Sequence, residues 1–297
     1  MLDLREIKIE DKQWFDALVE GNAYKTLEYN FTTAFIWREI FNIKVCEADG
    51  CLICLADKKT PTFLYPCGAG NKKSAVDKII EYCKKRGISA AFHSVSAKAK
   101  EELETMYPDM FEFEYDRDIA DYIYDTQSLM TLSGKKLSAK RNHINRFEQE
   151  HSDWSYEPID HSNIDEVYEM NLKWCEQSDC KNDGGLFDEA CAVKQAFTHF
   201  FDLKLDGGAI RTDGKIVAFS MGDRLDDDIY LVHIEKAFAD INGAYPMINK
   251  QFVINNASGY KYVDREDDAG VEGLRKAKLS YRPVIIAEKY SAKYIGE

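Results

Sequence analysis

The stretch that sets the expected fold runs Tyr260-Lys-Tyr-Val-Asp-Arg-Glu-Asp-Asp-Ala-Gly-Val-Glu-Gly-Leu-Arg-Lys-Ala-Lys-Leu-Ser-Tyr-Arg-Pro283. Its first residues alternate as at the end of a strand, and residues 273–279 have the composition of a short basic helix. Between them, residues 264–268 place four acids around one arginine, and Gly270 permits a sharp turn. A strand end, a charged turn and a helix start are a common layout for a polar binding site. A solvated loop of salt bridges is the alternative.

Composition predicts a folded protein of two domains or one large domain. The chain has 297 residues, of which 45% are hydrophobic, enough for a sizeable core. A net charge of −13 disfavours general DNA or RNA binding and binding to anionic membranes. No apolar run approaches the ~18 residues of a membrane helix and no signal-peptide core is present, so we expect a cytoplasmic protein. We expect the eight cysteines to be free thiols, and we expect no metal site, because no four ligands have zinc-site spacing.

The order of expected elements repeats once along the chain. Residues 43–55 predict a hairpin around Asp49-Gly50, followed by a strand at 61–66, a helix at 73–86 capped by Gly87, a strand at 88–93 and a helix at 97–106. Residues 209–220 predict a hairpin around Asp213-Gly214, followed by a strand at 228–235, a helix at 244–258, a strand at 261–264 and a helix at 271–279. We interpret this as the duplication of one β-β-β-α-β-α unit, with chance agreement among common turns as the alternative.

A basic segment at residues 133–151 separates the two halves. It holds five cations within twelve residues of an otherwise acidic chain, namely Lys135, Lys136, Lys140, Arg141 and Arg146. Like charges this close repel one another unless anions are near. The anions are either the protein's own carboxylates or an external phosphate, carboxylate or RNA backbone. Tyr122, which precedes the segment, is most simply a packing residue, with ligand contact as the alternative.

Two further positions have features of a site. Glu235 ends the expected strand at 228–235 and shares a face with His233. It is either a general base, an amine ligand or a half-exposed strand glutamate. Asp240-Ile-Asn-Gly-Ala244 enters the following helix, where free N–H groups bind a phosphate or the aspartate forms a simple N-cap. The motifs of serine hydrolases, P-loop nucleotidases and zinc proteases are absent from the sequence.

Four segments carry a resemblance to a known family. They are Tyr122-Ile-Tyr-Asp125, Leu129-Met-Thr-Leu-Ser-Gly-Lys-Lys-Leu137, Lys140-Arg-Asn-His-Ile-Asn-Arg-Phe147, and Arg265-Glu-Asp267 with Gly273-Leu-Arg-Lys-Ala-Lys-Leu-Ser-Tyr-Arg-Pro283. Together they resemble a bacterial family that is similar to the C-terminal domain of phosphatidylglycerol lysyltransferases. Those proteins are similar to FemABX-type aminoacyltransferases and belong to the Gcn5-related N-acetyltransferase superfamily. The resemblance covers nearly the whole chain.

The resemblance implies an α+β fold of two tandem Gcn5-related N-acetyltransferase-like domains, each a mixed, mostly antiparallel sheet flanked by helices. We expect these domains at residues 1–130 and 131–297, the second including the basic helix at 133–151. The resemblance also implies transfer of an acyl or aminoacyl group from an anionic donor, aminoacyl-tRNA or acyl-CoA, to an amine or hydroxyl acceptor. No other cofactor is expected. The alternative is a non-catalytic binding module of the same fold that senses an anionic metabolite.

Carried over by position, the basic helix and the segment from Arg265 to Tyr281 line the donor and acceptor pocket. The expected proton acceptor is Glu235 or Glu266, and Tyr281 is the expected proton donor to the leaving group. Arg265, Arg275 or backbone N–H groups are expected to stabilise the oxyanion. Substrate contacts are expected from Tyr122, Lys136, Lys140, Arg141, Asn142, Arg146, Asp267, Arg275 and Lys278. The expected cofactor contacts are Asn242 and Gly243, although their loop lacks the arginine or glutamine that opens the acyl-CoA loop of the superfamily.

Overall fold

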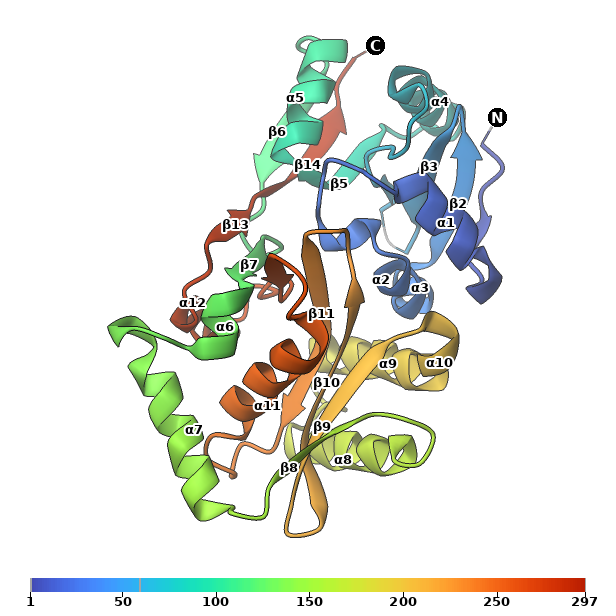
Figure 1. Cartoon of the computed structure of the whole chain (residues 1–297). Helices are drawn as coiled ribbons and strands as arrows, with labels where there is room; N and C mark the ends of the chain where they lie inside the picture. The colour runs from blue at the N-terminus through green and yellow to red at the C-terminus, as the bar shows by residue number, and fades with distance from the viewer. Residues whose placement is uncertain (1, 59, 297) are drawn as a thin grey trace. The chain divides into compact units, whose positions relative to one another are not determined.

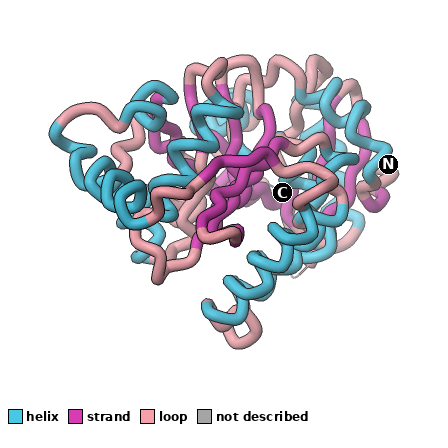
Figure 2. The backbone as a smooth tube through the Cα atoms, turned by 60° about the horizontal axis from the view of Figure 1, so that its bottom comes forward, coloured by secondary structure: helices cyan, strands magenta, loops and turns pink. Residues whose placement is uncertain are grey.

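The computed structural model describes residues 2–58 and 60–296, which form two compact units. Unit 1 comprises Met1–Asp121, Asp267–Val271 and Ile286–Glu297, and unit 2 comprises Tyr122–Glu266 and Glu272–Ile285. Each unit is built largely on one seven-stranded sheet, and Figure 2 shows the strands in magenta with helices in cyan packed on them.

The sheet of unit 1 has the strand order β1-β2-β3-β4-β5-β14-β6. Strands β4 and β5 are parallel, and the other neighbours are antiparallel. The strands are β1 (Arg5–Glu6), β2 (Ile43–Ala48), β3 (Cys51–Ala56), β4 (Thr62–Phe63), β5 (Ala91–Ser96), β6 (Phe111–Tyr115) and β14 (Lys289–Tyr294). The helices are α1 (Lys12–Val19), α2 (Phe31–Ile36), α3 (Arg38–Phe41), α4 (Lys72–Lys85) and α5 (Ala97–Met106), with the 3-10 turns η1 (Ile9–Asp11) and η2 (Leu27–Tyr29).

Helix α4 ends on the expected glycine. Gly87 has a φ of 70°, its N–H donates to the Lys84 carbonyl at 3.0 Å, and the Ile88 N–H donates to the Cys83 carbonyl at 3.1 Å. These two bonds form a Schellman motif, which satisfies the last carbonyls of the helix. Because the motif holds Ile88 against the end of α4, strand β5 begins at Ala91 instead of at the expected residue 88.

The sheet of unit 2 has the strand order β13-β7-β12-β11-β10-β9-β8, with β11 and β12 parallel. The strands are β7 (Asp121–Asp125), β8 (Ser155–Pro158), β9 (Asp206–Thr212), β10 (Lys215–Arg224), β11 (Ile229–Ala237), β12 (Tyr262–Asp264) and β13 (Ile285–Ala287). The helices are α6 (Thr126–Thr131), η3 (Lys135–Leu137), α7 (Ser138–Glu150), α8 (Ile164–Gln177), α9 (Gly184–Thr198), α10 (Phe200–Leu203), α11 (Ala244–Phe252), the π-helical turn η4 (Val253–Ala257) and α12 (Glu272–Ser280). Figure 1 shows α11 over one face of β9, β10 and β11, with α8 and α9 over the other.

The repeated order of elements is present in both sheets. Hairpin β2–β3 is followed by β4, α4, β5, α5 and β6, and hairpin β9–β10 is followed by β11, α11, β12, α12 and β13. Both hairpins turn on an Asp-Gly pair with positive φ at both residues, 53° and 73° at Asp49 and Gly50 and 49° and 71° at Asp213 and Gly214. Positive φ at both central residues is the type I′ geometry that matches strand twist. The parallel pairs, β4–β5 and β11–β12, are the pairs that α4 and α11 connect.

Two strands are exchanged relative to this repeat. Strand β7 follows β6 along the chain but pairs with β12 in the second sheet, and β14 follows β13 but lies between β5 and β6 in the first. Within unit 1, the fully buried Nζ of Lys289, the first residue of β14, lies 2.7 Å from Asp121 Oδ1 and 2.8 Å from Glu28 Oε1. The domain boundary expected after residue 130 stays a prediction, and the compact units differ from it because of this exchange.

Across the described ranges 2–58 and 60–296, no helix has both the length and the apolar character needed to cross a bilayer.

Candidate functional site

The candidate site lies in unit 2, where the parallel strands β11 and β12 stop pairing. Their last paired residues are Leu231 and Asp264. On the other side of β11, the register with β10 jumps from Met221–Ile234 to Gly222–Val232, so His233 is the extra residue of a β-bulge. A bulge bends its strand, and this one lies where β11 separates from β12. Beyond that point the two strands are connected by side chains.

Two side-chain bridges connect the diverging strands. Arg265 Nη2 donates to Glu235 Oε1 at 2.7 Å, and these side chains are only 11% and 12% exposed. His233 Nδ1 lies 3.0 Å from Glu266 Oε1, and His233 Nε2 lies 3.0 Å from Asp223 Oδ1. Burial disfavours the imidazolium, but the charge of Asp223 and hydrogen bonds to both carboxylates raise the pKa of His233 to about 10. His233 is therefore an imidazolium at neutral pH that donates from both ring nitrogens.

Aromatic rings and an amide enclose the Arg265–Glu235 pair. The Arg265 Cζ lies 4.8 Å from the centroid of the Tyr281 ring and 5.7 Å from that of Tyr124, both within cation–π range. Glu235 Oε2 accepts a second hydrogen bond, from Asn249 Nδ2 on α11 at 2.9 Å. Arg265 Nη1 is buried and has no hydrogen-bond partner among the described residues. Burial raises the pKa of Tyr281, which is therefore a neutral phenol at physiological pH.

Lys140 on α7 joins this group from the basic segment. Its Nζ lies 4.0 Å from the centroid of the Tyr281 ring. Burial and the charge of Arg265 lower the pKa of Lys140, while Glu235 opposes the shift. The structure thus brings Lys140 together with three expected catalytic residues, Glu235, Arg265 and Tyr281, whose roles stay predictions.

Lys278 and Tyr122 hold the backbone beside the pair. Lys278 is the buried residue of α12, and its Nζ donates to the Arg265 carbonyl at 2.5 Å. Tyr122 is fully buried; it accepts from the Arg265 N–H at 3.0 Å and donates its own N–H to the Glu266 carbonyl at 3.1 Å. These contacts hold the backbone at Arg265 in place and so position its side chain. Arg275, on the same helix as Lys278, is half-buried.

Two arginines of the basic segment have partners within the protein. Arg141 donates to the main-chain carbonyls of Leu132 and Gly134, the latter at 2.8 Å, and so closes the turn before α7. Arg146 pairs with Glu150 one helical turn later, at 2.7 Å on an exposed face. Part of the positive charge in this segment is therefore compensated by carbonyl and carboxylate acceptors of the protein itself.

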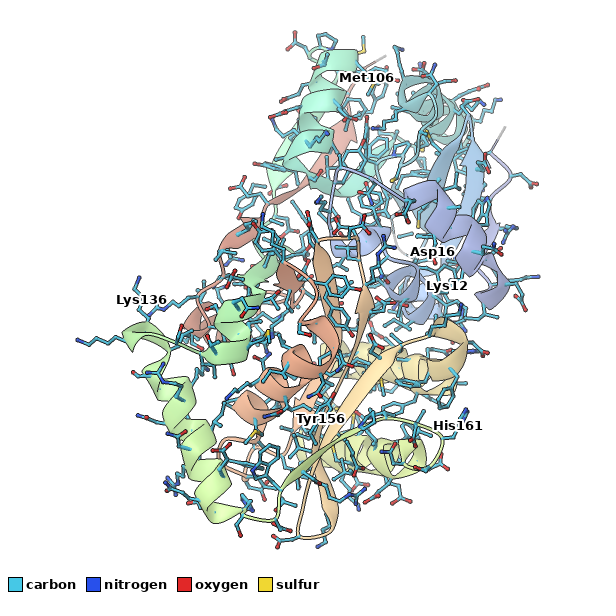
Figure 3. The ribbon with its side chains drawn as sticks, viewed as in Figure 1. Lys12, Asp16, Met106, Lys136, Tyr156 and His161 are labelled. Carbon is cyan, nitrogen blue, oxygen red and sulfur yellow. The ribbon has the colours of Figure 1, made fainter. Side chains whose placement is uncertain are left out.

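Of three other expected contact residues, two are exposed and the third belongs to unit 1. Lys136 is exposed and points away from α6 and α7 in Figure 3. Asn142 is exposed on α7. Asp267 belongs to unit 1, where its carboxylate accepts the Ala269 N–H at 2.9 Å. Their expected substrate contacts stay predictions.

Helix α7 packs against the N-terminus of α11. His143 Nδ1 lies 2.9 Å from Asn242 Oδ1. Gly243 has a φ of 88°, and a Cβ at this position would lie 2.3 Å from the His143 carbonyl oxygen and 2.9 Å from Phe147 Cβ. Only glycine permits this approach. Protein atoms thus already contact Asn242 and Gly243, the two expected cofactor residues.

Sequence analysis missed Asp223 and Asn249. Asn249 did carry a signal, since it is a fully buried amide among the buried apolar residues of α11, such as Met247 and Phe252. Asp223 carried none, because its position opposite His233 depends on the bulge between β10 and β11. In the described part of the chain, no cluster of His, Cys, Asp and Glu side chains has the arrangement of a metal site.

Sequence and fold are similar to known proteins. The chain matches the family described as phosphatidylglycerol lysyltransferase, C-terminal, over residues 22–293. A conserved protein of unknown function from Bacteroides thetaiotaomicron is 36% identical, with a TM-score of 0.95 over 99% of this chain and 100% of that one. The L-PGS structure from Bacillus licheniformis is 16% identical, with a TM-score of 0.70 over 99% of this chain and 94% of that one. An uncharacterised protein of Mycoplasmoides gallisepticum is 26% identical over 177 residues, which are 59% of this chain and 56% of that protein. The chain therefore spans little more than half the length of this curated relative.

The two sheets confirm the expected α+β class of two halves, each a mixed, mostly antiparallel sheet flanked by helices, and the solved structures share this fold. Family and fold together support an acyltransferase-type function. Because the match extends over most of its length, the chain belongs to the phosphatidylglycerol lysyltransferase C-terminal family.

Proposed function

We propose that the chain transfers an acyl or aminoacyl group from an activated donor to an amine or hydroxyl acceptor at the Arg265–Glu235 pair. The observation that carries this proposal is a buried ion pair between two strands that have just separated, enclosed by Tyr124 and Tyr281. Burying two charges is often no more stabilising than apolar packing. Perturbed ionisable groups of this kind concentrate at functional sites.

Acyl transfer needs groups of the kinds present here. The acceptor attacks the carbonyl carbon, negative charge develops on the carbonyl oxygen, and an alcohol or thiol leaves. Arg265 supplies positive charge for the oxyanion, and its Nη1 has no hydrogen-bond partner among the residues that the structure describes. As a neutral phenol, Tyr281 is then a proton donor for the leaving group.

An aminoacyl ester of tRNA is the donor that the surroundings favour over acyl-CoA. A CoA pyrophosphate would use the N-terminus of α11, where Gly243 is packed against the His143 carbonyl oxygen. A carbonyl oxygen at this position repels a phosphate. The name of the matched family describes transfer of a lysyl group to phosphatidylglycerol, which supports an aminoacyl donor and a lipid hydroxyl acceptor for this chain as well.

A binding module that senses an anionic metabolite is the second candidate. It is favoured by the pairing of both carboxylates near the diverging strands, Glu235 with Arg265 and Glu266 with His233. A site with paired carboxylates can bind a charged ligand, because binding does not require a free carboxylate base. Both candidate functions predict that the site binds an anionic ligand, but only the transferase predicts turnover.

The test offers aminoacyl-tRNA and acyl-CoA donors to the purified full chain, with phosphatidylglycerol vesicles or small amines as acceptors, and follows the labelled group by chromatography. Arg265→Lys keeps the charge but loses the planar fork, so we expect transfer to fall ~100-fold or more. Arg86→Lys, at the exposed C-cap of α4 in unit 1, is the matched control and should leave transfer unchanged. A melting temperature that rises with a donor, without any transfer, would favour the sensor instead.

A further inference from the structure

We propose that Lys140 is the proton acceptor of this site, the group that takes the proton from the attacking amine or hydroxyl. This role rests on the proposed function and replaces the assignment of Glu235 or Glu266 as the base. It follows from the contacts of both glutamates with strong donors and from the lack of an ion pair at Lys140 among the described residues.

Both carboxylates are held by strong donors. Glu235 receives Arg265 Nη2 at 2.7 Å on one oxygen and Asn249 Nδ2 at 2.9 Å on the other. Glu266 Oε1 lies 3.0 Å from the charged ring of His233. A carboxylate in such a pair must lose a charge-assisted hydrogen bond before it can take a proton. Neither glutamate is therefore arranged as a free base.

Lys140 is arranged differently. In the described part of the chain no carboxylate forms an ion pair with its Nζ, whose close contact is the Tyr281 ring at 4.0 Å. The charged and titratable groups around it are Arg265 and Glu235 at the diverging strands, Tyr281 after α12 and Tyr124 on β7. Burial and the nearby guanidinium both favour the neutral amine, consistent with the lowered pKa of Lys140.

The neighbouring basic residues Arg141, His143 and Lys278 have other hydrogen-bond partners. Arg141 donates to main-chain carbonyls, and His143 is bonded to Asn242. The Lys278 ammonium, on α12, is bonded to the Arg265 carbonyl. Lys140 is thus the amine of the site that can gain and lose a proton without breaking an ion pair.

The step is balanced without a further reactant. The acceptor nitrogen or oxygen forms a bond to the carbonyl carbon of the donor, and its proton passes to the lone pair of Lys140 Nζ. The bond from the carbonyl carbon to the leaving oxygen or sulfur then breaks. The leaving atom takes a proton, from the Lys140 ammonium directly or through Tyr281, and Lys140 returns to the neutral amine.

The test follows the proton on Lys140 by NMR, without relying on turnover. The full chain is labelled with carbon-13 at the lysine Cε atoms and titrated from pH 6 upward, with Lys140→Arg to assign the resonance. Lys136→Arg assigns the internal control, an exposed lysine four residues away. We expect the Lys140 resonance to begin its shift at a lower pH than the resonance of the exposed control lysine. Two lysines that titrate together would refute the role of Lys140 and leave the proposed function standing.

A second arm measures transfer. Arginine stays protonated and cannot accept a proton, so Lys140→Arg should lower kcat ~100-fold or more. Lys194→Arg, at an exposed position on α9 with no expected role in the site, should leave kcat unchanged. Wild-type kcat and pH profile in Lys140→Arg would overturn the base assignment alone. An early-titrating Lys140 in a chain that transfers nothing from any donor would overturn the proposed function, and with it the role of Lys140.

Discussion

Replacing Lys289 with methionine tests whether the buried ion pair of unit 1 holds that unit together. Lys289 and Asp121 are both 0% exposed at their side chains, and Glu28 lies 2.8 Å from the same ammonium. Methionine nearly preserves length and volume but leaves two carboxylates buried without their cation. Removing one partner of a buried pair costs about 3–5 kcal/mol. This is a large share of the ~5–15 kcal/mol that stabilises a typical native protein.

The measurement is guanidinium unfolding at pH 7, followed by circular dichroism and by hydrogen exchange of β5 and β14. Burial opposes the charge of Lys289, but Asp121 and Glu28 raise its pKa. Its contribution is therefore fully present below the ordinary lysine value and is complete at pH 7. Lys85→Met, which breaks an exposed pair with Glu81 on α4, is the control. Lys289→Met and Lys85→Met with the same unfolding midpoint would refute the reasoning. Adding Asp121→Leu to Lys289→Met should recover part of the loss, because it removes one of the unpaired charges.

Two further predictions concern unit 2. His233 has a pKa raised to about 10, so its contribution to stability is complete below its ordinary value of 6.5 and is lost as pH rises through 10. The melting temperature should therefore fall more steeply between pH 7 and pH 10.5 in the wild type than in His233→Gln, and parallel curves would contradict the imidazolium bridge. Gly243→Ala should lower the melting temperature because its Cβ meets the His143 carbonyl oxygen at 2.3 Å, whereas Gly214→Ala, with a similar positive φ and open space around it, isolates the cost of backbone strain. Equal losses in the two glycine variants would show that α7 yields to the added methyl group.

Local features of the fold could be predicted from the sequence. The Asp-Gly turns at residues 49–50 and 213–214 determine their own backbone geometry, and Gly87 determines the end of α4. Strands β7 and β14 have no such signal for their partner. Each presents the same alternation whichever sheet it joins, so their exchange depends on contacts between residues far apart in the sequence.

The site was also predictable only where a local sequence signal exists. Arg265 and Glu235 stand out because each is a charge at the end of an apolar strand. The sequence does not show which cation of the basic segment approaches them. Lys140 and Arg141 are neighbours on α7, yet the helical turn of about 100° between them brings one to Tyr281 and directs the other to the carbonyls of Leu132 and Gly134.

The exchange of β7 and β14 has a consequence for synthesis. Strand β14 follows every strand of the second sheet along the chain, yet it is the strand that joins β5 to β6 in the first sheet. During synthesis, β5 and β6 therefore keep open hydrogen-bonding edges until β14 has been made. The sheet that begins first along the chain is completed after the other one, and neither half can be shortened or expressed separately without leaving the other with a missing strand.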